Sequence, residues 1–157
     1  MSEIMVRLAT PEDAQGYEEA WQSAMDTLRE TYRTSKQFLD DWTPPSDLTR
    51  IAAVLDGRVV GVVQCYVQEE RMHIMRFGVR SDFRGKGVGR ALIEFVADLA
   101  RSKGFRCLDV YTIKETGSVP IYEALGFKVL SEEEAKWAES DKYDKLTDVH
   151  LERPVRP

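Results

Sequence analysis

The 157-residue sequence predicts an α/β (α+β) fold, in which helices flank one central mixed, mostly antiparallel sheet of about seven strands. Three observations predict it. Asp56-Gly57 separates two strand-like apolar runs, which is a strong hairpin signal. Apolar residues recur at helical spacing over 88–99, between two further strand-like runs, so the flanking strands should pair in parallel. The length and ordinary composition fit a single domain over residues 1–157.

The first half of the chain predicts a strand, two helices and an antiparallel meander. Residues 4–8 form the strand, and Thr10 caps a helix over about 11–30. A short helix around 34–41 ends before Pro44-Pro45, because proline cannot continue it. Three meander strands follow, over residues 51–55, 58–67 and 72–79, with reversals at 56–57 and 69–71.

The second half predicts a loop and a helix, followed by shorter elements. The loop spans 80–86, and the helix after it ends at Gly104 as a C′ residue. Residues 132–146 form a charged excursion that is expected to be partly helical. The remaining elements are a strand at 107–112, a short helix at 118–125, and strands at 127–130 and 147–152.

Charge is unevenly distributed along the sequence. The net charge is −5, but residues 76–90 alone carry +4, whereas residues 1–75 carry −6 and residues 131–148 carry −4. An acidic chain argues against a nucleic-acid partner, while the short basic island suggests a small anion. No apolar run reaches the ~18 residues of a membrane helix. The N-terminus does not resemble a signal peptide, so we expect a cytoplasmic protein without a membrane partner.

The cysteines and histidines do not predict a metal site. Cys65 and Cys107 both lie in apolar strand-like runs, which favours reduced structural thiols. His73 and His150 are far apart in the sequence, and there is no Cys/His cluster of the kind that binds zinc.

The stretch from Phe77 to Arg90 carries the chemistry. It passes from a strand through a loop into the start of a helix, where the first backbone N–H groups lack helical partners and attract anions. Alternating glycines permit left-handed backbone and close approach. These features predict a phosphate cradle, with a tight solvated loop as the alternative. The residues involved are Arg84, Gly85, Lys86, Gly87, Val88, Gly89 and Arg90. Their spacing fits neither a Walker A loop nor a Rossmann fingerprint.

The pattern Arg84-Gly85-Lys86-Gly87-Val88-Gly89 resembles the Q/R-x-x-G-x-G/A signature of GNAT-type N-acetyltransferases. The expected order of elements is similar to that fold over essentially the whole chain. The resemblance implies that N–H groups between Gly85 and Arg90 bind the pyrophosphate of acetyl-coenzyme A. It also implies that the strand end Phe77-Gly78-Val79 hydrogen-bonds the pantetheine arm and the acetyl carbonyl. Gly78 itself indicates a bulge or a close backbone approach, or an ordinary strand-end glycine.

A second segment, Ile121 to Phe127, is similar to the family's L-Y-E-x-x-G-F stretch. In many members its tyrosine protonates the departing thiolate, which makes Tyr122 the candidate general acid. A phenol with a pKa near ~10 suits a thiolate with a pKa near ~8.5. The alternative is a core tyrosine. Glu115 and Ser118 stand where members often have Asn and Ala.

The sequence assigns no general base. His73, Glu69, Glu70 and Asp109 are the nearby options. His73 is expected to be packed or hydrogen-bonded. Asp109 is expected to be a buried, paired carboxylate or an edge charge, and the two glutamates are expected to be solvated turn residues.

The acceptor site is expected to form from residues 25–42 and 131–148. Their acids and aromatic residues suit a cationic amine through charge pairing and cation–π contact, although a solvated charge run with core aromatics is the plainer alternative. The aromatic residues concerned are Tyr32, Trp42, Trp137 and Tyr143.

The leading hypothesis is an N-acetyltransferase that joins acetyl-coenzyme A and a small-molecule amine or peptide N-terminus in a ternary complex, as a monomer or homodimer. One alternative is a non-catalytic acyl-coenzyme A sensor or scaffold of the same fold. Another is a phosphate-binding regulatory domain unrelated to coenzyme A.

Overall fold

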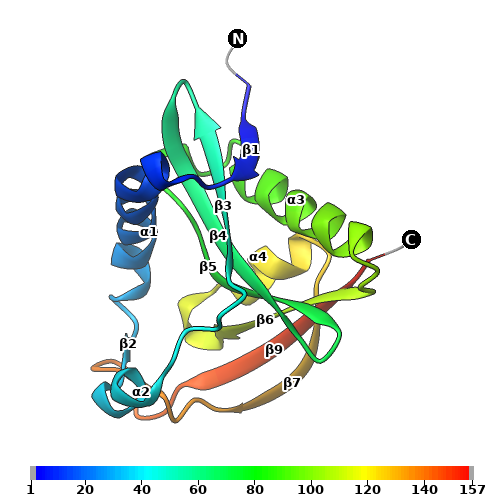
Figure 1. Cartoon of the computed structure of the whole chain (residues 1–157). Coiled ribbons are helices and arrows are strands. Elements are labelled where there is room, and N and C mark those ends of the chain that lie inside the picture. Colours follow the sequence, from blue (N-terminus) through cyan, green and yellow to red (C-terminus); the bar gives the residue numbers. More distant parts are fainter. Residues whose placement is uncertain (1–2, 156–157) are drawn as a thin grey trace.

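A computed structural model describes residues 3–155, and over this range the strands form one seven-stranded sheet with the order β1-β3-β4-β5-β6-β9-β7 (Figure 1). Most neighbouring strands are antiparallel, as the sequence predicts. The strands are β1 (Met5–Leu8), β3 (Thr49–Leu55), β4 (Arg58–Gln68), β5 (Arg71–Val79), β6 (Cys107–Ile113), β7 (Lys128–Glu134) and β9 (Thr147–Pro154).

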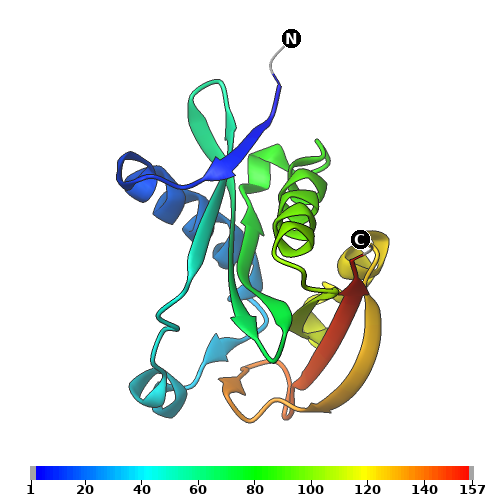
Figure 2. The same cartoon turned by 45° about the vertical axis from the view of Figure 1, so that its right-hand side comes forward.

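Helices cover both faces of the sheet. α1 lies on one face and α3 on the other, as Figure 2 shows in blue and green. Tyr17 and Ala20 of α1 pack on Val62 of β4, while the apolar stripe of α3 packs into the larger core on the opposite face. The helices are α1 (Ala14–Leu28), α2 (Lys36–Asp41), α3 (Val88–Ser102) and α4 (Val119–Ala124). None of the helices within residues 3–155 has the length and apolar character needed to cross a membrane.

Both predicted reversals of the meander are confirmed. Asp56 and Gly57 have φ values of 52° and 77°, and Glu69 and Glu70 have φ values of 51° and 64°. Two consecutive left-handed residues match the right-handed twist of the strands they join. β3, β4 and β5 therefore form the expected antiparallel meander.

β5 and β6 pair in parallel, as predicted, but only from Met72 to Ile74 opposite Leu108 to Val110. Beyond these pairs the two strands separate. The backbone groups of β5 that face β6 after Ile74 consequently have no strand partner in residues 3–155. The sheet is split at this point into two diverging halves.

A bulge in β5 lies beside this split. Val62 pairs with Gly78 and Gln64 pairs with Met75, so one residue of β4 stands opposite two of β5. Arg76, inside the bulge, has a φ of 50°. The bulge expected near Gly78 is thus present. The close approach at Gly78 comes from a helix side chain rather than another backbone, because a Cβ there would lie 2.6 Å from the Cβ of Ala24 on α1.

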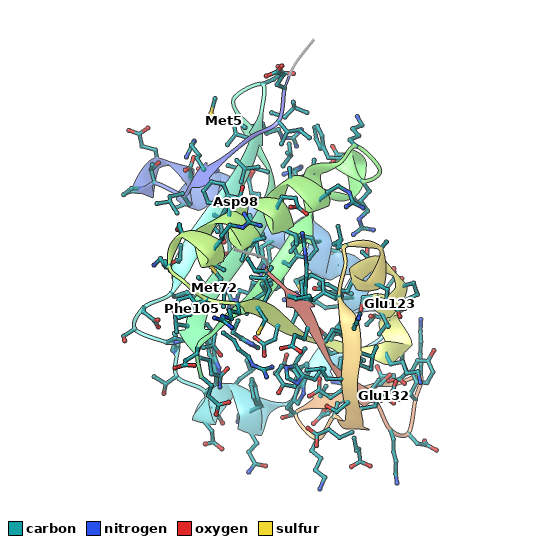
Figure 3. All side chains as sticks on the ribbon, turned by 90° about the vertical axis from the view of Figure 1, so that its right-hand side faces the viewer. Met5, Met72, Asp98, Phe105, Glu123 and Glu132 are labelled. Carbon is teal, nitrogen blue, oxygen red and sulfur yellow. The ribbon has the colours of Figure 1, made fainter. Side chains whose placement is uncertain are left out.

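The expectation of a partly helical excursion at 132–146 is wrong. β7 continues to Glu134, because it keeps pairing with β9, and the side chain of Glu132 on this edge strand is exposed (Figure 3). The chain then forms β8 (Ala138–Glu139), which pairs with β2 (Arg33–Thr34) (Figure 1). Buried Ala135 and Leu146 pack on Ile113 and fix both ends of the excursion.

Substitution of Gly78 by alanine should separate α1 from the sheet. The added methyl would overlap Ala24, and overpacking of this kind costs about 1–3 kcal/mol. Urea denaturation of Gly78→Ala should show this loss in the free energy of unfolding. The matched control is Ala24→Gly, which costs about 1 kcal/mol of helix propensity. The double variant should be more stable than the sum of the two losses predicts; additivity would contradict the close contact.

Candidate active site

A cavity of about 660 Å³ lies at the gap between the diverging strands β5 and β6. Its wall combines the end of β5, the loop and first turn of α3, the end of β6 with the turn after it, α4, and the C-terminal half of α1 with Tyr32. Because α1 and α3 lie on opposite faces of the sheet, the cavity connects the two faces. Its volume is within the range of small-molecule and cofactor sites.

The first turn of α3 presents unpaired backbone donors to this cavity. The first helical bond runs from the Ala91 N–H to the Gly87 carbonyl, with an N–O distance of 3.0 Å. The N–H groups of Val88, Gly89 and Arg90 therefore have no partner within the helix. All three residues line the cavity. Together with the helix dipole, these donors favour an anion at this end of the cavity.

Two glycines shape the loop before α3. Gly85 and Gly87 have φ values of 76° and 84°, a left-handed conformation that glycine adopts without strain. Gly89 serves a different purpose, because a Cβ there would approach the Phe77 ring to 3.1 Å. The missing side chain lets the start of α3 pack closely on the end of β5.

Two arginines of the basic island flank the cavity and one lysine does not. Arg84 approaches Thr27 of α1 at 3.5 Å, and Arg90 donates to the Ala124 carbonyl at 3.1 Å. Both line the cavity, whereas Lys86 does not. The Lys86 ammonium lies 5.2 Å from the centre of the Phe83 ring. The structure thus brings every other predicted site residue to one cavity: Phe77, Gly78, Val79, Arg84, Gly85, Gly87, Val88, Gly89, Arg90 and Tyr122.

Tyr122 belongs both to the core and to the cavity wall. Its ring packs against Phe77 and Phe127 with centroid distances of 5.8 and 5.6 Å. Its hydroxyl makes no hydrogen bond to residues 3–155 and is not sealed from open space. Burial raises the pKa of Tyr122 far above the ordinary value, so the phenol is neutral at physiological pH.

A hydroxyl cluster in the cavity wall was missed by sequence reasoning. The hydroxyl oxygens of Thr116 and Ser118 lie 2.8 Å apart, and Ser118 also contacts the Thr112 hydroxyl. The signal was the departure from the family pattern at Ser118. Glu115, the other departure, accepts a hydrogen bond from the Thr147 N–H and ties this loop to β9.

The two segments expected to form the acceptor site do lie side by side, because β2 pairs with β8. Tyr32 lines the cavity, and Trp137 packs edge-on against it at 5.8 Å. The Trp137 indole donates to Asp148 at 3.1 Å. Trp42 and Tyr143 do not line this cavity. Of these four aromatic residues, Tyr32 therefore forms part of the cavity wall, and Trp137 packs against it from outside the cavity.

Asp109 lies between the two histidines of the chain, on the face of the sheet that carries α1. Its Oδ1 is 3.0 Å from His73 Nδ1, and its Oδ2 is 2.8 Å from His150 Nε2. Burial raises the pKa of Asp109, but hydrogen bonds from both imidazoles outweigh it and hold the pKa below the usual value. The expectations of a hydrogen-bonded His73 and a buried, paired Asp109 are confirmed. Within residues 3–155, no group of three or more metal-ligating side chains is arranged to hold a metal.

Comparisons with known proteins identify the family of the chain. The sequence matches the family described as "Acetyltransferase (GNAT) family" over residues 14–127. It is 37% identical over 79 residues to N-acetylaspartate synthetase of Rattus norvegicus, covering 48% of this chain and 26% of that protein. It is 35% identical over 79 residues to glucosamine 6-phosphate N-acetyltransferase of Trypanosoma brucei brucei, covering 46% of this chain and 52% of that protein. The matches thus span about a quarter to a half of these relatives.

The fold has solved counterparts. The structure superposes on the ribosomal-protein-S18-alanine N-acetyltransferase from Escherichia coli with a TM-score of 0.76 and 16% identity, covering 99% of this chain and 96% of that one. A likeness at this identity establishes the fold. The fold and the site define an acyltransferase of the GNAT type. The chain belongs to the acetyltransferase (GNAT) family.

Proposed function

We propose that the protein transfers an acetyl group from acetyl-coenzyme A to a primary amine of a small molecule or a peptide N-terminus. The observation that carries the proposal is the single cavity that joins three features. These are the unpaired N–H groups of α3, the unpaired edge of β5 and the neutral phenol of Tyr122.

The α3 end of the cavity suits the pyrophosphate. The N–H groups from Gly85 to Arg90 supply donors, and Arg84 and Arg90 supply positive charge beside them. The pantetheine arm then extends along β5 from Val79 to Phe77, where the strand has no partner on the side of β6. Backbone groups there hydrogen-bond the arm, and an N–H group at the bulge stabilises the oxyanion that forms on the acetyl carbonyl.

The reaction then proceeds by direct attack. The neutral amine attacks the thioester carbonyl, so a C–N bond forms, and the C–S bond breaks when the tetrahedral intermediate collapses. Tyr122 gives its phenolic proton to the coenzyme A thiolate. Burial raises the pKa of Tyr122, which keeps the phenol protonated before the reaction. The same apolar surroundings destabilise a charged thiolate, so the sulfur accepts the phenolic proton as the C–S bond breaks.

Two measurements test the proposal. Calorimetry with coenzyme A should show tight, salt-sensitive binding, and its absence would favour a domain that binds another phosphate. Thiol release from acetyl-coenzyme A should then depend on an amine, tested with small amines, polyamines, amino acids and a peptide N-terminus. Tight binding without transfer to any of them would instead support a non-catalytic acyl-coenzyme A sensor or scaffold.

Gly87→Asp should weaken coenzyme A binding by at least about tenfold, which is ~1.4 kcal/mol. The new carboxylate would stand beside the bound pyrophosphate. Gly87→Asn is the matched control, because asparagine has the same shape and also tolerates the left-handed φ of 84°. Calorimetry should find the asparagine variant much closer to wild type. Equal affinities for the two variants would contradict a pyrophosphate at this position.

Tyr122→Phe should lower kcat by about 10²-fold or more, which is the usual contribution of a general acid. The ring stays in the core, so affinity for acetyl-coenzyme A should change less than about twofold. Steady-state thiol release measures both. Tyr143→Phe, an exposed position away from the cavity, is the control and should behave as wild type. A fully active Tyr122→Phe enzyme would remove the proposed acid.

A further inference from the structure

The two histidines of the chain meet on one carboxylate, although 77 positions separate them in the sequence. His73 on β5, Asp109 on β6 and His150 on β9 occupy three neighbouring strands. His150 lies between Val149 and Leu151, which face the core under α3. Because side chains alternate along a strand, the imidazole points to the opposite face, the one on which α1 packs.

Tyr111, which stacks on His150, lies where the gap between β5 and β6 begins. The last parallel pair joins Ile74 to Val110, and Tyr111 is the next residue of β6. Tyr111 is opposite His150 in the ladder, and the two rings stack at 4.2 Å with an interplanar angle of 5°. Thr112, one residue further, already lines the cavity. His150 itself does not line the cavity; it lies on β9, across β6 from this end of the gap, on the face of the sheet that carries α1.

The hydrogen bond to Asp109 selects the tautomer of a neutral His150 ring. An ionised Asp109 only accepts hydrogen bonds, so the neutral His150 ring carries its proton on Nε2, 2.8 Å from Asp109 Oδ2. The other nitrogen, Nδ1, makes no hydrogen bond to residues 3–155 and is not among their sealed polar atoms. Its lone pair is therefore open. A carboxylate that orients an imidazole in this way is the arrangement that general-base catalysis requires.

Other groups at this opening are less suitable as bases. Asp109 uses both of its oxygens on the histidines. Asp148 accepts from Trp137 with one oxygen, and its other oxygen is sealed from solvent without a partner. His73 pairs with Asp109 in the ladder, one step before the last parallel pair, so it lies within the paired part of β5 and β6.

We propose that His150 is the general base of the acetyl transfer, and that Asp109 is the positioning residue that holds its ring. The assignment rests on the proposed function. As the amine attacks the acetyl carbonyl and the C–N bond forms, His150 Nδ1 takes the proton that nitrogen loses. The C–S bond then breaks, Tyr122 protonates the thiolate, and both residues return to their starting states by exchange with solvent.

Acidic side chains surround the stacked pair of Tyr111 and His150. Tyr111, which stacks on it, lies in the field of Asp109 on β6, Asp148 on β9 and Glu133 on β7, with Arg71 on β5 as the opposing cation. His73, the other titratable group of the cluster, sits on the far side of Asp109. Three carboxylates against one guanidinium leave a surplus of negative charge around the stacked rings. The same surplus attracts an amine that arrives as an ammonium ion.

The kinetic test compares His150→Gln with His73→Gln, which makes the same change on the other side of Asp109. The best amine from the acceptor panel is the probe. His150→Gln should lower kcat by about 10²-fold or more, leave KM for acetyl-coenzyme A unchanged, and abolish the fall in kcat at acidic pH that protonation of Nδ1 causes. His73→Gln should keep kcat within about tenfold and retain that fall. Wild-type kcat and pH dependence in His150→Gln would overturn the assignment.

A spectroscopic test covers the case in which a variant does not fold. Long-range proton–nitrogen NMR of the full wild-type chain, labelled with nitrogen-15 at histidine, should show the neutral His150 ring protonated at Nε2. Protonation at Nδ1 would overturn the assignment. A wild-type chain that transfers acetyl to none of the amines would overturn the proposed function together with this inference. An active wild type with an unaffected His150→Gln variant would overturn this inference alone.

Discussion

The site depends on a single interruption in the sheet. β5 and β6 pair over three residues and then separate, and the cavity lies in the space between them. Unpaired backbone groups in a protein interior are costly unless something satisfies them, so an edge left open in the middle of a sheet needs a partner. An extended ligand arm along β5 would supply it, in the way that a peptide adds a strand to an exposed edge. Because residues of both α1 and α3 line the cavity, the same gap gives the two faces of the sheet a common opening.

Close packing on both sides holds the split open. On one face α1 reaches β5 closely enough that only glycine fits at position 78, and the neighbouring bulge turns the strand there. On the other face Gly89 lets α3 start against the Phe77 ring. The residues between these contacts, Phe77 to Val79, are those that line the cavity from β5. The backbone that would bind the ligand is thus fixed from both sides before anything binds.

Local sequence signals were sufficient for most of the fold and for one end of the site. The hairpin signal of Asp56-Gly57 and the apolar stripe of α3 are both patterns of residues that lie close together in the sequence. The glycines of the loop before α3 likewise indicate its backbone conformation. Contacts between distant segments were not readable in this way. The β2–β8 pair joins residues 33–34 to 138–139, and the charge of the 132–146 segment gave no sign of it. The shared Asp109 was equally hidden, because only the strand order places His73 and His150 on either side of it. Each histidine alone indicated nothing beyond packing.

The positions of the proposed acid and base fit direct transfer better than a covalent acyl-enzyme. A thiol nucleophile would need to reach the cavity as a thiolate. Neither Cys65 nor Cys107 lines the cavity in the part of the chain described, and burial raises the pKa of each to about 11. Tyr122, in contrast, lines the cavity from the side of α3 and α4, and the proposed base His150 lies on the face of the sheet that carries α1. A thioester held in the gap would have a proton donor near its sulfur on one face and a proton acceptor near the incoming amine on the other. This separation suits a single step in which both substrates are bound, since the acid and the base then act on opposite ends of the same tetrahedral intermediate without competing for one proton.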